Sequence, residues 1–74
     1  MDKKLEKELI KKIEPYCDIQ DEINAVLLYL DTDNYRKKLI DFIDISKERG
    51  NTITKDQFMT LVVILSNEEE NSRK

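Results

Sequence analysis

Residues 54–65 read TKDQFMTLVVIL and hold the longest apolar run of the chain. Seven of the eight residues 58–65 are apolar. Thr54 with Gln57 three residues later is a capping box, which predicts that a helix begins here. On a 3.6-residue period the apolar positions cover most of the circumference, so we expect this helix to be buried on most sides. A strand is the alternative, because LVVIL has high β propensity and periodicity does not settle a short apolar run.

Apolar residues recur at helical spacing upstream of this run. They predict three further helices, at about 2–13, 19–30 and 34–49. Asp2 and Asp18 are the expected N-caps of the first two, and Pro15 ends the first. Gly50, the only glycine of the chain, is the expected left-handed residue after the third helix.

These segments define the expected fold class. With a fourth helix at about 54–66, the fold is all-α, a compact array of four short helices in which helix 4 is central. Residues 67–74 are polar, and we expect them to form a frayed tail. The whole chain, residues 1–74, is then a single helical domain.

The composition limits how such a small domain can be stabilised. The chain has 74 residues, one Cys and no His, so an internal disulfide is impossible and the usual zinc sites are absent. Oligomerisation or economical helix packing remains as the means of stabilising the domain.

The net charge of −3 gives no general attraction to nucleic acid or an anionic membrane. No targeting segment is visible and the apolar run is too short to span a bilayer, so a cytoplasmic protein is expected.

The candidate chemical groups do not assemble into a reactive site. Cys17 has no histidine to activate it and has Asp18 beside it, so a passive thiol is expected. Asp31 and Asp33 begin a pattern that departs from an EF-hand, because Arg36 stands where the loop needs Gly. Without a nucleophile–base pair or a glycine-rich phosphate loop, we expect no enzyme, no cofactor and no metal.

Charge is unevenly distributed along the chain. Residues 15–34 hold five acidic and no basic residues, whereas residues 35–55 hold six basic and three acidic residues. The two segments can neutralise each other inside the fold or form a binding surface divided by sign.

The third and fourth predicted helices, joined at Gly50, have the order of a helix-turn-helix. The fourth is too apolar to be a recognition helix, but the third could contact phosphates. The residues that would do so are Arg36, Lys37, Lys38, Lys47 and Arg49. A nucleic-acid-associated accessory factor is therefore the alternative hypothesis, with a solvated helix face as the simpler interpretation.

The first hypothesis is a small non-enzymatic helical protein–protein interaction module. A mostly apolar fourth helix needs cover that three short helices supply poorly, so a second copy in a homodimer or another protein would complete it. The first helix, attached through Pro15, could reach the second copy. The candidate interface residues are Leu5, Leu9, Tyr29, Met59 and Val63. A regulator, inhibitor or immunity-type protein of a bacterium, phage or other mobile element fits this size, and Lys-, Ile- and Asn-rich usage is typical of an AT-rich genome.

Overall fold

The computed structural model describes residues 2–73, which form four α-helices and one short 3₁₀ helix. The elements are α1 (Lys3–Ile13), η1 (Glu14–Tyr16), α2 (Gln20–Tyr29), α3 (Asp33–Glu48) and α4 (Lys55–Ser72). The predicted all-α array of four helices is confirmed. Residues 58–65 are helical throughout, so the strand alternative for this run is wrong.

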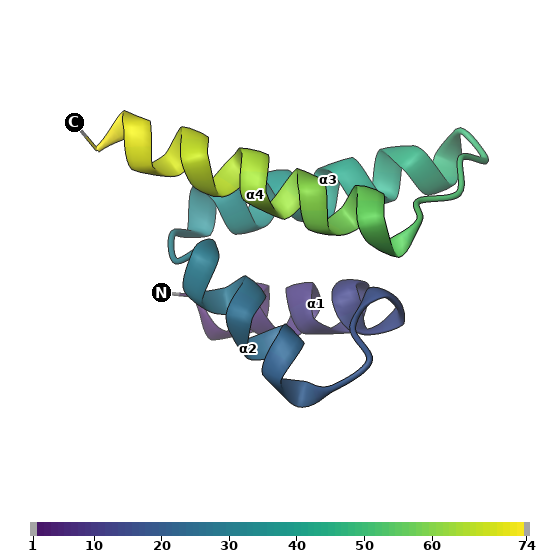
Figure 1. Ribbon diagram of the computed structural model, residues 1–74, viewed down its shortest axis with the longest axis horizontal. Coiled ribbons are helices and arrows are strands. Elements are labelled where there is room, and N and C mark those ends of the chain that lie inside the picture. Colours follow the sequence, from purple (N-terminus) through teal and green to yellow (C-terminus); the bar gives the residue numbers. More distant parts are fainter. Residues whose placement is uncertain (1, 74) are drawn as a thin grey trace.

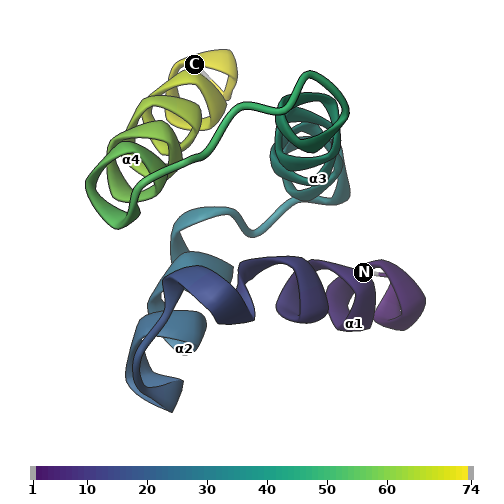
Figure 2. The ribbon, with the colours of Figure 1, turned by 90° about the vertical axis from the view of Figure 1, so that its right-hand side faces the viewer.

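The four helices lie in two layers (Figures 1 and 2). α3 and α4 run antiparallel beside each other in one layer, and α1 and α2 make the other. α3 packs on α1 and α4, while α4 packs on α3 and α2. One face of the α3–α4 layer is therefore covered by α1 and α2, and the opposite face is left open.

The hydrophobic core lies between the two layers and draws on every α-helix. Its buried members are Leu9, Ile13, Ile23, Val26, Leu30, Leu39, Ile40, Ile43, Phe58, Val62 and Leu65. The ring of Phe58 stacks on that of Tyr16, with 4.8 Å between the centroids and 13° between the planes. This contact ties η1 to the first turn of α4.

The helix starts of α1 and α4 follow local sequence signals. Asp2 Oδ1 accepts hydrogen bonds from the backbone N–H groups of Lys4 and Leu5, at 2.9 and 3.3 Å. Thr54 Oγ1 accepts from the N–H of Gln57 at 3.1 Å, and the Gln57 side chain accepts from the N–H of Thr54 at 3.0 Å. Both predicted caps are confirmed, because each satisfies donors that a helix N-terminus leaves unpaired.

The turn after α3 is also as predicted. Gly50 has φ +72°, a backbone conformation that costs an L side chain about 1 kcal/mol or more. The N–H of Asn51 then donates to the carbonyl of Ser46 at 2.9 Å. Of the two hydrogen bonds of a Schellman ending, this is the one that spans more residues. It directs the chain across toward α4.

Two boundaries differ from the prediction. Asp18 does not cap α2: the N-cap is Ile19, without a side-chain hydrogen bond, because the Asp18 carboxylate pairs with Lys55 of α4. α4 also continues past the expected end at residue 66. Residues 67 to 72 of the predicted polar tail 67–74 are helical, and residue 74 lies outside the described residues.

Glu69 explains why α4 is so long. Its carboxylate is buried, with 3% of the residue exposed, and accepts from Thr32 Oγ1 at 2.8 Å. It also accepts from the N–H of Asp31 at 3.4 Å and from the Arg73 guanidinium at 3.1 Å. Thr32 is the N-cap of α3, so the Glu69 charge lies at a helix N-terminus, where the helix dipole favours it.

α1 belongs to the core of its own protomer rather than reaching outward as an arm. Leu9 and Ile13 are completely buried, and Lys12 Nζ lies 2.6 Å from Asp44 Oδ1 of α3. That hydrogen bond is the main cause of the raised pKa of Lys12. Leu9, which the sequence suggested for an interface, is therefore unavailable to a partner.

Candidate protein-binding surface

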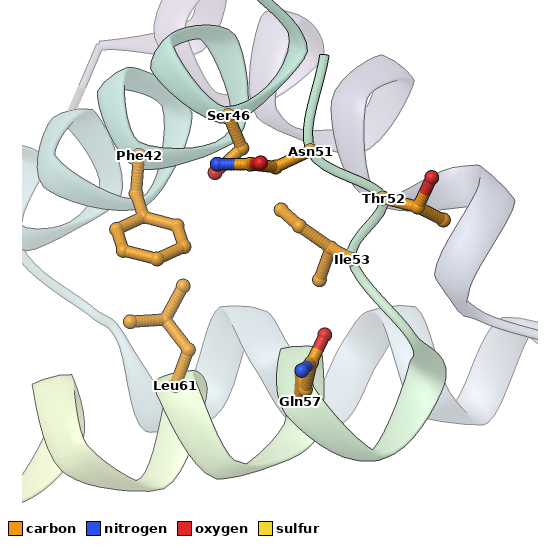
Figure 3. A pocket seen from close by; sticks show the side chains of 7 residues that line it. All are labelled: Phe42, Ser46, Asn51, Thr52, Ile53, Gln57 and Leu61. Carbon is orange, nitrogen blue, oxygen red and sulfur yellow. The ribbon is translucent and has the colours of Figure 1, made fainter. Parts of the chain in front are cut away.

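A groove with an apolar part and a more polar part runs between α3 and α4 on the open face of their layer. Figure 3 shows Phe42 of α3 and Leu61 of α4 pointing toward each other, with Ile53 of the connecting segment beside them. One hollow of about 480 Å³ is lined by Phe42, Ser46, Asn51, Thr52, Ile53, Gln57 and Leu61. A second, of about 430 Å³, is lined by Phe42, Asp56, Gln57, Thr60, Leu61 and Ile64. Because they share Phe42, Gln57 and Leu61, the two hollows are one continuous groove.

The groove forms because some apolar residues of α3 and α4 face away from the core. Phe42 is 46% exposed and Ile64 is 50% exposed, although both lie next to buried positions of their helices. Leu39 and Leu65, on the inner side, fill the core. On both α3 and α4, apolar residues occupy more of the helix circumference than the α1–α2 layer can cover. The remaining apolar residues therefore face outward.

The segment that connects α3 to α4 bounds the groove at one end. The Gly50 turn and the hydrogen bond from Asn51 to Ser46 carry residues 51–53 along the edge of the groove. Gln57 is held by the Thr54 capping box, so its side chain is fixed beside Ile53 (Figure 3). These features are preorganised, which reduces the entropy that a binding partner must overcome.

The lining is suited to binding rather than to reaction. Of the described residues that line the groove, Asp56 alone carries a titratable side chain. The rest are hydrocarbon, hydroxyl or amide groups. A hydrophobic strip with polar groups along it is the composition of a protein interface, in which apolar anchors fill a groove and the rim stays hydrated.

The interface residues suggested by the sequence are spread over several places. Leu5 and Met59 are half-buried against the core, and Leu9 is inside it. Val63 is 49% exposed but does not line the groove. Tyr29 lines a separate, polar hollow between α2 and α4, with Asp31, Ser66 and Arg73 among its neighbours.

Sequence reasoning missed the groove residues for an identifiable reason. Phe42 belongs to the same apolar stripe of α3 as Leu39 and Ile43, so periodicity assigns it to the core. Ile64 is equally apolar and sits beside Leu65. The sequence did contain a signal for the groove, namely a second row of apolar residues on each of two consecutive helices. Because one buried face cannot accommodate two rows, one row on each helix had to be exposed.

The five basic residues proposed to contact nucleic acid do not share one environment. Arg36 is 4% exposed; its Nε donates to the carbonyl of Leu30 at 2.6 Å and its Nη2 to that of Leu27 at 3.0 Å. It therefore caps α2 and cannot reach a phosphate. Lys38 Nζ lies 4.5 Å from the centroid of the Tyr35 ring. Lys38 is nevertheless exposed, as are the remaining three residues, Lys37, Lys47 and Arg49.

Part of the acidic segment is neutralised inside the fold. Lys55 pairs with Asp18 and, at 3.3 Å, with Glu22. The hydrogen bond with Asp18 is the largest cause of the raised pKa of Lys55. Arg73 likewise pairs with Asp31 and with Glu69. The ion pairs hold α4 to the ends of α2, which is the internal neutralisation that the charge distribution allowed.

Cys17 lies between these groups, and their combined effect does not activate its thiol. Its thiol is partly buried, and burial raises the pKa, assisted by the negative charge of Glu22. Lys55 acts in the opposite direction with a smaller effect than either. Only the thiolate is a good nucleophile, so this environment disfavours covalent chemistry.

Within residues 2–73, no group of three or more carboxylate or thiol side chains is placed to hold a metal ion. In that same part of the chain, no helix has both the length and the apolar content needed to cross a bilayer.

Comparisons with protein-family models, with curated proteins and with solved structures found no match to this chain.

Proposed function

We propose that the protein is a non-enzymatic helical module that acts by binding another protein, and that the α3–α4 groove is its binding surface. The observation that carries the proposal is the continuous groove between α3 and α4, in whose apolar part Phe42 and Ile64 lie on opposite sides and are each about half exposed. Leaving two large side chains in water forgoes about 1 kcal/mol or more for each. Docking of a partner recovers that free energy.

The size and the chemistry of the chain support a binding role. A small cytoplasmic regulator, inhibitor or immunity-type protein of a bacterium or mobile element works by occupying a surface of its target, which requires a rigid apolar face and no reactive groups. The partner is another protein or a second copy of this chain. The nucleic-acid alternative receives less support, because Arg36 is committed to capping α2.

The test is affinity capture from a lysate of the source organism with tagged protein, with an untagged copy of the chain added to detect self-capture. Ile64→Asp places a charge in the groove, and we expect the captured partner to fall at least about tenfold, since burying an unpaired carboxylate costs more than 1.4 kcal/mol. The matched control is Leu28→Asp, because Leu28 is 80% exposed on α2 and lies away from the groove.

Circular dichroism should show that both variants keep the helical content of the wild type, since each substituted side chain is exposed. Retention of the partner by Leu28→Asp and its loss from Ile64→Asp supports the proposal. If Ile64→Asp captures the same proteins, and the added copy, as strongly as the wild type does, the groove is not the binding surface.

A further inference from the structure

The two sides of the groove carry opposite charges. On α3, Lys38 lies four residues before Phe42 and Arg49 lies seven after it, so all three share one row of the helix. On α4, Asp56 lines the groove and Glu68 lies one turn beyond Ile64. The four charged side chains are exposed, and none takes part in the ion pairs found within residues 2–73.

Two other acidic residues of α3 flank this row. Asp41 lies three residues after Lys38, about 60° around the helix, and Glu48 precedes Arg49, about 100° around it, so both lie on the same side of the row without belonging to it. Asp44 is paired with Lys12 of α1. The row of α3 that borders the groove is basic. The charged residues of α4 beside the groove, Asp56 near one end and Glu68 near the other, are both acidic.

We infer that the groove is occupied by a second copy of this chain, in a dimer whose twofold axis runs along the groove. This inference rests on the proposed function and specifies its partner. Rotation about such an axis places α3 of each copy over α4 of the other. A basic row then meets an acidic row twice, and Phe42 of each copy lies over Leu61 and Ile64 of the other.

The antiparallel arrangement of α3 and α4 brings the charges to matching levels. Ser46 and Gln57 line the same end of the groove, so Arg49 lies at the level of Asp56. At the other end α3 begins and α4 ends (Figure 1). Lys38 is eight residues before Ser46 and Glu68 is eleven after Gln57, so at about 1.5 Å per residue the two lie at similar levels. The twofold axis preserves these levels, so Arg49 faces Asp56 and Lys38 faces Glu68 across the dimer.

The charges exclude the other twofold arrangement of this face. An axis across the groove would place α3 on α3 and α4 on α4, which opposes like charges at each end.

The test uses two complementary charge variants and sedimentation velocity. Lys38→Glu with Arg49→Glu makes both rows acidic, and Asp56→Lys with Glu68→Lys makes both rows basic. We expect the wild type to dimerise and each variant alone to dimerise at least about tenfold more weakly, because like charges then face each other. An equimolar mixture of the two variants should form a one-to-one dimer, since opposite charges meet at every contact.

The matched control is Lys37→Glu with Lys47→Glu, which makes the same change in charge on exposed positions of α3 outside the row. This control should dimerise like the wild type. As a measurement that needs no variant, a carbodiimide applied to a mixture of isotopically light and heavy wild-type chains should join Lys38 of one copy to Glu68 of the other.

A wild type that stays monomeric at every concentration, or a mixture of the two variants that does not associate, overturns the inference. So does the absence of mixed light–heavy links between Lys38 and Glu68. The proposed function survives these failures if the wild type captures a different protein from the lysate and Ile64→Asp does not. If no capture responds to Ile64→Asp, the proposed function itself fails.

Discussion

The guanidinium of Arg36 closes the C-terminus of the preceding helix by donating from Nε to the Leu30 carbonyl at 2.6 Å. The last carbonyls of a helix have no partner within it, and Leu30 is completely buried, so water cannot satisfy them. Nη2 donates to the Leu27 carbonyl, and Nη1 lies 3.7 Å from Glu6. One side chain of α3 therefore fixes the end of α2 and approaches α1.

Replacement of Arg36 by Met should be among the most damaging single changes to stability. It keeps much of the side-chain volume but leaves the buried Leu30 carbonyl and the partly buried Leu27 carbonyl unpaired, and an unpaired buried acceptor costs about 1–3 kcal/mol. A domain of this length has only about 4–11 kcal/mol in total. Urea unfolding followed by circular dichroism measures the change.

Lys37→Met is the control for Arg36→Met, because Lys37 is exposed at the next position of the same helix. We expect it to change the free energy of unfolding by less than about 0.5 kcal/mol. Equal effects of the two substitutions would contradict the role of Arg36 as the cap of α2.

Glu69 should contribute to stability although it stands in a run of glutamates near the chain end. Glu69→Ala removes the acceptor of Thr32 Oγ1 and the pairing with Arg73. We expect a loss of about 1–3 kcal/mol in the free energy of unfolding, as for a buried charged hydrogen-bond partner. Glu70→Ala, at an exposed neighbouring position, should have little effect.

A double-mutant cycle separates this contact from helix propensity. Thr32→Ala and Glu69→Ala should show a coupling of about 0.5 kcal/mol or more, because they remove the same hydrogen bond. Additive effects would mean that Glu69 stabilises α4 without Thr32.

Local features of the sequence were sufficient to predict the helices. The capping box of Thr54 and Gln57 and the left-handed Gly50 act within a few residues, so short-range patterns reveal them. Glu69 was different, since its partner Thr32 is 37 positions away. No local pattern distinguishes it from Glu68 and Glu70, and this is why the last turns of α4 were expected to fray.

The groove depends on the same long-range information. Whether Phe42 lies inside or outside is determined by which side of α3 contacts α1, and periodicity alone does not contain that choice. Arg36 was counted with its basic neighbours because the carbonyls that it caps belong to another helix. The sequence could predict that α4 would be incompletely covered, but not which residues would remain exposed.

The Asp31 carboxylate should make stability depend on pH in the acid range. The Glu69 carboxyl, which can donate to the Asp31 carboxylate when it is protonated, and then the Arg73 guanidinium lower the pKa of Asp31 below the ordinary value of 3.8. A lowered pKa means that the folded state favours the ionised form. The resulting stabilisation is present above pH 3.8 and is lost as the pH falls through the lower folded-state value.

We therefore expect Asp31→Asn to be less stable than the wild type at neutral pH and equally stable once Asp31 is protonated. Urea unfolding at a series of pH values measures the difference. Asp41→Asn, at an exposed position of α3, controls for the loss of one negative charge and should show no comparable pH-dependent difference. A deficit of Asp31→Asn that persists unchanged at the lowest pH would refute this assignment.

Cys17 should react slowly with alkylating reagents in the folded protein. Burial and then the charge of Glu22 raise the pKa of the thiol, so less thiolate is present at neutral pH. We expect iodoacetamide to react more slowly than with the same chain in urea, and the rate to rise at higher pH.

The neighbours of Cys17 supply two controls with opposite directions. Glu22→Gln removes a negative charge and should lower the midpoint of the pH–rate profile. Lys55→Gln removes the positive charge that opposes the shift and should raise it. If the folded wild type alkylates as fast as the denatured chain, with the same midpoint, the thiol is not protected by its surroundings.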